Sequence, residues 1–204
     1  MLGKLALFSV CVAVAFSVCT DKVTNVVQIS DDSNGNYNVV FNNADGATYD
    51  NNSNPSCYNN EANLRMPGVL GLISGTVVVN QAIVLDNATQ ALLTLTKNDN
   101  LIKTACKDGK SNNFLIPDKD CKFDFCPKET ALCKALSTPG THTLGELEGD
   151  AGIGSEIALP NLSDAIKPLL KGQWRVTIKI QNGAGTVVAS ILIPSNEDWL
   201  YIEQ

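Results

Sequence analysis

The sequence predicts an all-β domain in which two antiparallel sheets form a sandwich or barrel. The first observation is a hairpin at residues 171–194, whose first arm alternates apolar with polar side chains. The apolar positions of that arm are Trp174, Val176, Ile178 and Ile180. The second observation is a series of short apolar runs after residue 69, separated by turn residues at regular spacing, which is typical of such folds.

The chain begins with residues that are typical of a secretory leader. Lys4 gives a positive start, and residues 5–18 form an apolar run that is too short for a membrane span. We expect residues 1–19 to be removed as a signal peptide, with cleavage after Cys19 as the simplest boundary. No later segment is long and apolar enough to span a bilayer, so we expect a protein that is secreted or delivered to the lysosomal lumen.

Residues 20–66 form a polar, Asn-rich segment before the main domain. Residues 21–29 are expected to form a short strand. The stretch from 30 to 63 is crowded with Asn, Asp, Ser and Gly, so we expect a long polar loop with one strand at residues 37–42.

The main domain is expected to cover residues 67–195 and to be followed by a short C-terminal tail, residues 196–204. Its first strands are expected at residues 71–79, 82–85 and 91–96, with a further run from 101 towards Cys106. A short helix is expected at residues 163–170, before the hairpin.

Composition limits the classes of partner and of compartment. The chain has 204 residues with 44% hydrophobic content, which is enough for one domain with a sizeable core. A net charge of −6 and the lack of a basic run argue against nucleic acid. Three N-glycosylation sequons fit the secretory route, at Asn51, Asn87 and Asn161.

Five cysteines follow the leader, and an oxidising compartment would pair most of them. The odd number means that one thiol stays free, pairs with another chain, or pairs with Cys19 if cleavage falls earlier. The spacing of Cys121, Cys126 and Cys133 is faintly zinc-like, but a secreted chain favours disulfides over a metal site.

No catalytic motif is evident, and we predict a protein that is not an enzyme and needs no cofactor. A Ser–His–acid or Cys–His site would have to use the only histidine, His142, which reads as an exposed strand residue. A two-carboxylate hydrolase stays open as the weakest hypothesis, because the chain has 21 acidic residues. Glu146, Glu148 and Asp150 lack the spacing of a calcium loop and are expected to be solvated surface.

Several short motifs occur in the order seen in one lipid-binding family. The hairpin starts with G-Q-W-R-V at residues 172–176, and I-A-L-P at 157–160 precedes it. Upstream lie G-T-H-T-L at 140–144 and F-D-F-C at 123–126. Over roughly residues 70–194, the ordered set resembles the ganglioside GM2 activator-like branch of the ML (lipid-recognition) domain group.

The resemblance implies a two-sheet β-cup with an apolar cavity and a non-enzymatic role. Such a protein extracts a glycolipid or phospholipid from a membrane and carries or presents it, in some cases to a lipid hydrolase. Buried acyl chains would contribute roughly 0.8 kcal/mol per methylene. The candidate cavity walls are Val77, Val79, Leu93, Leu95, Trp174, Val176, Ile178 and Ile180, although ordinary core is the simpler interpretation of any one of them.

The cysteine-rich segment carries the candidate membrane contact. Phe114, Leu115 and Ile116 are consecutive apolar residues in a polar loop, so they either anchor the loop inward or face a membrane. With the resemblance, the favoured disulfides are Cys106–Cys121 and Cys126–Cys133.

One departure from the family affects the remaining cysteine. Ala189 stands where the family has a cysteine that pairs near the N-terminus, so Cys57 is expected to lack that partner. A second hypothesis for the whole chain is a secreted β-sandwich for protein interaction or immune recognition. Such a module would use its polar loops and glycans and would have no lipid cavity.

Overall fold

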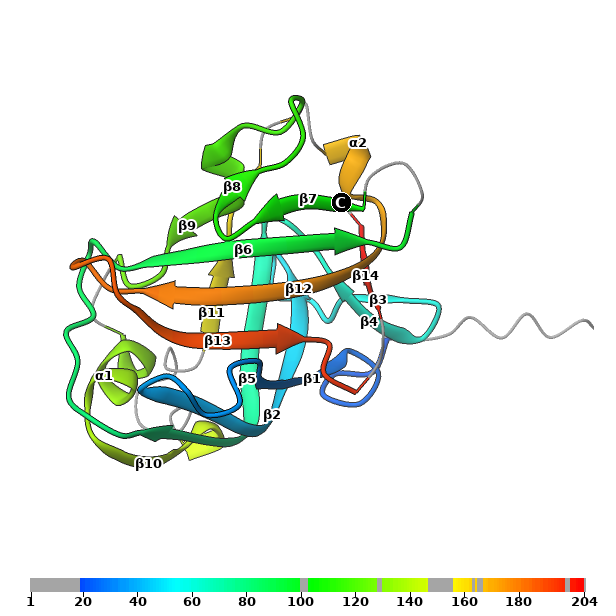
Figure 1. Ribbon diagram of the computed structural model, residues 1–204. Helices are drawn as coiled ribbons and strands as arrows, with labels where there is room; N and C mark the ends of the chain where they lie inside the picture. Colours follow the sequence, from blue (N-terminus) through cyan, green and yellow to red (C-terminus); the bar gives the residue numbers. More distant parts are fainter. Residues whose placement is uncertain are drawn as a thin grey trace, which may run out of the picture.

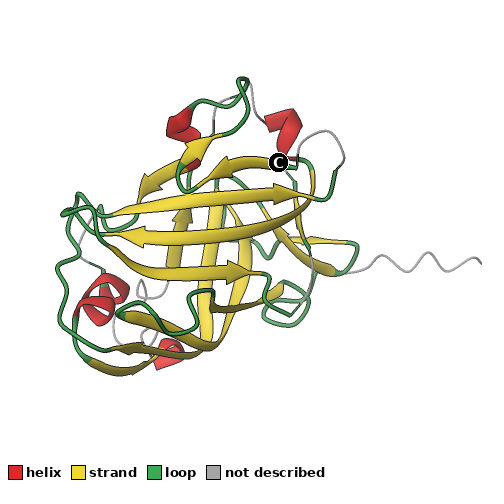
Figure 2. Ribbon diagram, viewed as in Figure 1, coloured by secondary structure: helices red, strands yellow, loops and turns green. Residues whose placement is uncertain are grey.

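The computed structural model describes residues 19–99, 103–127, 130–146, 156–162, 164, 167–196 and 199–203. Two β-sheet layers pack face to face, and the strands of one layer run across those of the other (Figures 1 and 2). All but one of the strand pairs in this part of the chain are antiparallel. The predicted all-β, two-sheet fold with disulfide-bonded loops and short helices is confirmed.

The first layer is organised around one long strand, β5 (Gly68–Val79). Along one edge β5 pairs with nearly the whole of β2 (Val39–Asp50), and along the other with β10 (Gly140–Thr143) and β11 (Glu156–Leu159). The prediction of a strand at residues 71–79 is therefore confirmed, with three more residues at its start.

The second layer is organised around the predicted hairpin, which forms β12 (Gly172–Gln181) and β13 (Val187–Ile193). Along its opposite edge β12 pairs with β6 (Gln90–Lys97). The start of β12 also pairs with β14 (Leu200–Ile202), on the same edge as β13. The remaining strands of this layer are short: β3 (Cys57–Tyr58), β4 (Glu61–Leu64), β7 (Thr104–Lys107), β8 (Lys110–Ser111) and β9 (Lys122–Asp124).

The strand β1 (Val26–Asp31) belongs to both layers. Val26 to Ile29 pair with β2, whereas Ser30 and Asp31 pair with β13. The two sheets are therefore joined by backbone hydrogen bonds along one side, and the inner faces are held against each other there.

Within the described residues, four short helices connect the strands: η1 (Asp118–Cys121), α1 (Ala131–Ser137), η2 (Leu144–Glu146) and α2 (Lys167–Leu170). The sequence predicted α2 but not α1. The Thr130 side chain caps α1 by accepting a 3.1 Å hydrogen bond from the backbone N–H of Cys133.

The N-terminal segment contributes far more structure than the sequence predicted. The expected loop at residues 30–63 contains a twelve-residue strand, β2, together with β3 and β4. Small residues such as Ala44 and Ala47 are 0–1% exposed in β2, so the strand packs closely despite its poor β propensity. Pairing with β5 along its length supplies the stability that its composition lacks.

Two other element predictions are wrong. Residues 82–85 are not a strand, and Val84 there is 72% exposed. The expected tail contains β14, which pairs with β12 and runs parallel to β4. Leu200 and Ile202 are buried in the core, which explains why this end of the chain is ordered.

Three disulfides are present among the residues that the structure describes. Cys106–Cys121 and Cys126–Cys133 are the favoured pairs and are confirmed. Cys57 lacks the hairpin cysteine that the family has at the position of Ala189, but it is not unpaired, because it forms a disulfide with Cys19. Pairing with Cys19 is one of the three alternatives that the odd cysteine count left open, and cleavage after Cys19 would remove this bond. Residues 1–18 lie outside the described residues.

Candidate functional site

The candidate wall residues come from both layers and meet in the core. Val77 and Val79 lie on β5, Leu93 and Leu95 on β6, and the other four on β12. All eight are between 0% and 4% exposed and belong to one hydrophobic cluster that includes residues of both sheets. The alternation of apolar and polar residues in the sequence thus correctly identified which side chains of β5, β6 and β12 face the core.

The inner faces of the two sheets pack against each other in one hydrophobic cluster. Of five pockets in the described part of the chain, none is lined by any of the eight candidate wall residues. These pockets open to solvent and have volumes of about 160 to 420 Å³. A lipid-sized cavity between the sheets therefore stays a prediction. Packed as they are, the eight side chains act as core.

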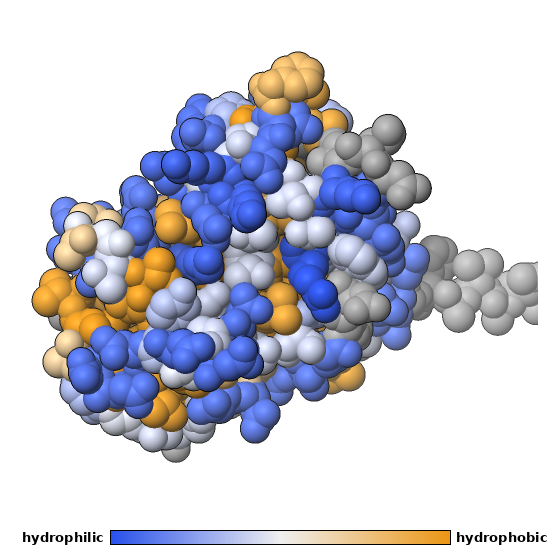
Figure 3. Space-filling view, viewed as in Figure 1, coloured by the Kyte–Doolittle hydropathy of each residue, from blue (hydrophilic) through white to orange (hydrophobic). Residues whose placement is uncertain are grey.

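The loop between β8 and η1 carries the candidate membrane contact, and its three apolar residues differ sharply in exposure. Phe114 is 95% exposed, Leu115 is 48% exposed, and Ile116 is only 4% exposed and belongs to the core cluster. Ile116 anchors the loop inward, whereas Phe114 projects into solvent, and contact of Phe114 with a membrane stays a prediction. The space-filling view shows apolar surface at this end of the molecule (Figure 3).

Hydrogen bonds within the loop fix the position of the exposed tip. The backbone N–H of Leu115 donates to the Asn113 side-chain oxygen at 2.9 Å, and that of Ile116 donates to the Asn113 carbonyl at 2.9 Å. The backbone N–H of Ser111 donates to the Asp118 carboxylate at 2.8 Å across the base of the loop. Cys121, at the end of η1, is bonded to Cys106 on β7. Little conformational entropy remains to be lost when this tip binds a surface.

An ion pair connects the turn between β7 and β8, which precedes the Phe114 loop, to the hairpin of β12 and β13. Lys179 on β12 donates a 2.7 Å hydrogen bond to the Asp108 carboxylate, in the turn between β7 and β8. This hydrogen bond raises the pKa of Lys179, and its partial burial opposes the rise. The turn is tight, since Asp108 and Gly109 both have positive φ.

The helix α2 lies at the same end of the molecule as β8 (Figure 1). Its last carbonyls accept hydrogen bonds from sheet residues: Lys97 donates to the Leu169 carbonyl at 2.7 Å, and the Trp174 indole donates to that of Leu170. Leu170 is buried and Leu169 is partly buried against the core. Ile166, in the helix expected at residues 163–170, lies outside the described residues.

The remaining sequence candidates are spread over the surface. The sequon residues Asn51, Asn87 and Asn161 are all exposed, as a glycan requires. His142 lies on β10 as predicted but is half-buried, with its Nε2 2.7 Å from the Thr138 carbonyl oxygen. Glu148 and Asp150 lie outside the described residues.

The described part of the chain contains no group of three potential metal ligands and no helix long and apolar enough to cross a membrane. No family model matches the chain, and no curated protein matches it either. The resemblance to the ML group therefore stays a prediction that rests on the ordered motifs.

One pocket draws on residues that sequence reasoning missed. It lies beside β1, β4 and β14, and its aromatic side chains are Trp199 and Tyr201. The sequence analysis expected a short strand at residues 21–29 but assigned the segments of β4 and β14 to a polar loop and a tail. An aromatic pair two residues apart in that tail was the available signal for a strand with one buried and one accessible face.

Proposed function

We propose that the protein is a non-enzymatic lipid-binding or lipid-transfer protein of the secretory route. It takes a glycolipid or phospholipid from a membrane and carries or presents it. The three disulfides are consistent with an extracellular or lysosomal environment. Delivery by the N-terminal leader is part of the proposal.

The observation that carries the proposal is the graded exposure of Phe114, Leu115 and Ile116. These residues form a continuous apolar run that begins in solvent and ends in the core between the sheets. If Phe114 enters a bilayer, the three consecutive apolar residues then extend from the bilayer to the protein core. Apolar surface held in solvent by a fixed loop is typical of a membrane or protein contact.

Lipid uptake would require the two sheets to separate next to this loop. The layers share hydrogen bonds along β1, so separation is favoured away from that side. Each methylene that then leaves water would contribute about 0.8 kcal/mol, so an acyl chain can offset the lost contacts between core side chains.

The test is native mass spectrometry of protein purified without detergent, together with transfer of fluorescent phospholipid and glycolipid between vesicles. Bound lipid and protein-dependent transfer are the expected results. Recovery of lipid-free protein only, with no transfer of either class, would reject the proposal.

The second candidate, a sandwich module for protein interaction, is favoured by one observation: the candidate wall residues already fill the space between the sheets. The same experiment separates the two functions, because an interaction module neither retains nor moves lipid.

A further inference from the structure

We infer that the pocket beside β1, β4 and β14 binds a hexose ring of a carbohydrate. This inference does not depend on the proposed lipid function, because the pocket shares no residue with the Phe114 loop. Its volume is about 290 Å³, at the lower end of the range for small-molecule sites and suited to a single ring.

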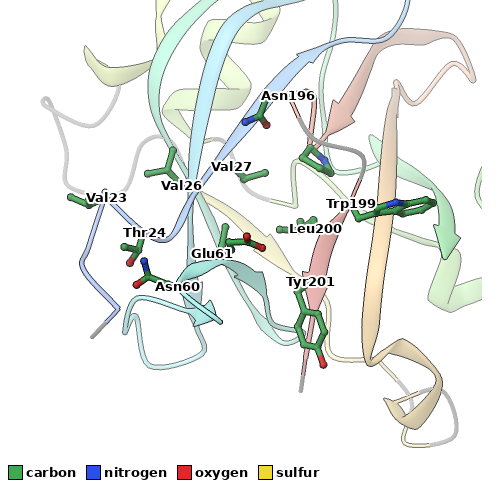
Figure 4. A pocket seen from close by; sticks show the side chains of 12 residues that line it. Val23, Thr24, Val26, Val27, Asn60, Glu61, Asn196, Trp199, Leu200 and Tyr201 are labelled. Atoms are coloured by element: carbon green, nitrogen blue, oxygen red, sulfur yellow. The ribbon is translucent and has the colours of Figure 1, made fainter. Parts of the chain in front are cut away.

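Three segments that are distant in sequence supply the pocket. They are residues 23–27 before and within β1, residues 60–62 at the start of β4, and, near β14, Pro194, Asn196 and residues 199–201. The labelled side chains surround Glu61 and Leu200, with Trp199 on one side and Asn60 on the other (Figure 4). The disulfide Cys19–Cys57 and the parallel pairing of β14 with β4 hold these segments together.

Apolar and aromatic residues also line the pocket. Leu200 and Ala62 are 4% and 7% exposed, and Trp199 is half-buried. Tyr201 is held in place by stacking on Tyr58, with 3.6 Å between the ring centroids. One face of a pyranose ring carries only C–H groups, and such a face packs well against an indole.

Polar side chains with free hydrogen-bonding capacity complete the pocket. Within the described part of the chain, the side chains of three of them make no hydrogen bond or ion pair: Asn60, Glu61 and Asn196. The two carboxamides offer both donors and acceptors, and the carboxylate offers acceptors only. A sugar hydroxyl both donates and accepts, so a polyhydroxyl ring matches this set.

Other ligand classes fit less well. Among the described residues that line the pocket, Glu61 is the only charged one, and its carboxylate would repel a phosphate or carboxylate ligand. An ammonium ligand would leave the N–H groups of both carboxamides without acceptors. An acyl chain would leave all of these polar groups unpaired.

The test uses the intact mature chain and a panel of methyl glycosides of glucose, galactose, mannose and N-acetylglucosamine. The chain has two tryptophans, and Trp174 is fully buried, so a change in fluorescence on sugar addition reports on Trp199. We expect a saturable change with at least one glycoside. Absence of a saturable response to every glycoside at millimolar concentration would overturn the inference.

Variants connect the response to the pocket. Glu61→Gln is expected to weaken the binding of the responding sugar about tenfold by removing a charge-assisted hydrogen bond. Trp199→Ala is expected to weaken it by about the same factor when measured by calorimetry. Val84→Ser, on a distant loop, is the matched control and should bind as the parent does. Unchanged affinity in both pocket variants would overturn the inference, and the Glu61→Gln result stands even if Trp199→Ala fails to fold.

A second arm distinguishes a free sugar from a sugar on a membrane. Vesicles that display the responding sugar on a lipid are compared with the free methyl glycoside. Phe114→Ser should leave the affinity for the free sugar unchanged, because the Phe114 loop is not part of the pocket. A loss of free-sugar binding in Phe114→Ser would contradict the pocket assignment.

Discussion

Replacing the exposed tip of the β8–η1 loop should weaken membrane binding without affecting the fold. The change is the double substitution Phe114→Ser with Leu115→Ser. Phe114 is 95% exposed, so its side chain contributes almost nothing to the core, and Leu115 is about half exposed. Ile116 keeps the loop anchored because it stays in the core.

The expected magnitude follows from these exposures. Full burial of a phenylalanine or leucine side chain is worth about 2 kcal/mol, within a range of roughly 1.5–3 kcal/mol. Nearly all of this is available for Phe114 and about half for Leu115, which gives about 3 kcal/mol for the pair. A difference of that size corresponds to roughly a 150-fold lower affinity for vesicles.

The assay is co-sedimentation with phospholipid vesicles over a range of lipid concentrations, together with urea unfolding of each variant. Val84→Ser is the control, because it removes an apolar side chain that is 72% exposed on a different loop. Its vesicle affinity and its free energy of unfolding should both stay within about 0.5 kcal/mol of the parent values. Equal vesicle binding by the double variant and the parent would refute the assignment of this loop as a membrane contact.

Three further outcomes are expected. Cys57→Ser should lower the free energy of unfolding by about 4 kcal/mol, because its disulfide closes a 38-residue loop, and mass spectrometry of the mature chain should find Cys19 retained. Ile178→Ala should cost about 2–5 kcal/mol in urea unfolding, whereas Thr177→Ala on the outer face of the same strand should cost far less. Backbone N–H groups that follow Asp50 lower its pKa, so the stability it gives its loop is present above the ordinary value of 3.8 and is lost as pH falls below it. The protection of amides in that loop against exchange, relative to the intrinsic rate at each pH, should therefore fall in acid, and Asp50→Asn should abolish this dependence.

The inner faces of the two sheets were predictable because their signal is local. Alternation along β12 places every second side chain on one face, whatever the strand pairs with. The same reasoning found β5 and β6, and all eight predicted wall residues are buried. What alternation does not specify is whether two such faces enclose a cavity or fill the space themselves.

Helix α1 was missed although the sequence contains its signal. Leu132, Cys133, Ala135 and Leu136 are all buried, and their spacing fits one face of a helix. Thr130 before them is a suitable N-cap. The cysteine spacing indicated disulfide-bonded loops, and the helix was overlooked for that reason. A disulfide does not exclude a short helix, and Cys133 on α1 is bonded to Cys126.

By itself the sequence determined the fold class, the central hairpin, the buried faces and an apolar triplet in a disulfide-bounded loop. Each depends on the order of neighbouring residues. Only the tertiary structure decided that the Asn-rich segment supplies β2, that residues after 196 supply β14, and that Cys57 pairs with Cys19. These features depend on partners far away in the chain, and pairing with a long strand such as β5 outweighs weak local propensity. For the same reason, the pocket around Trp199 exists only once three distant segments are brought together.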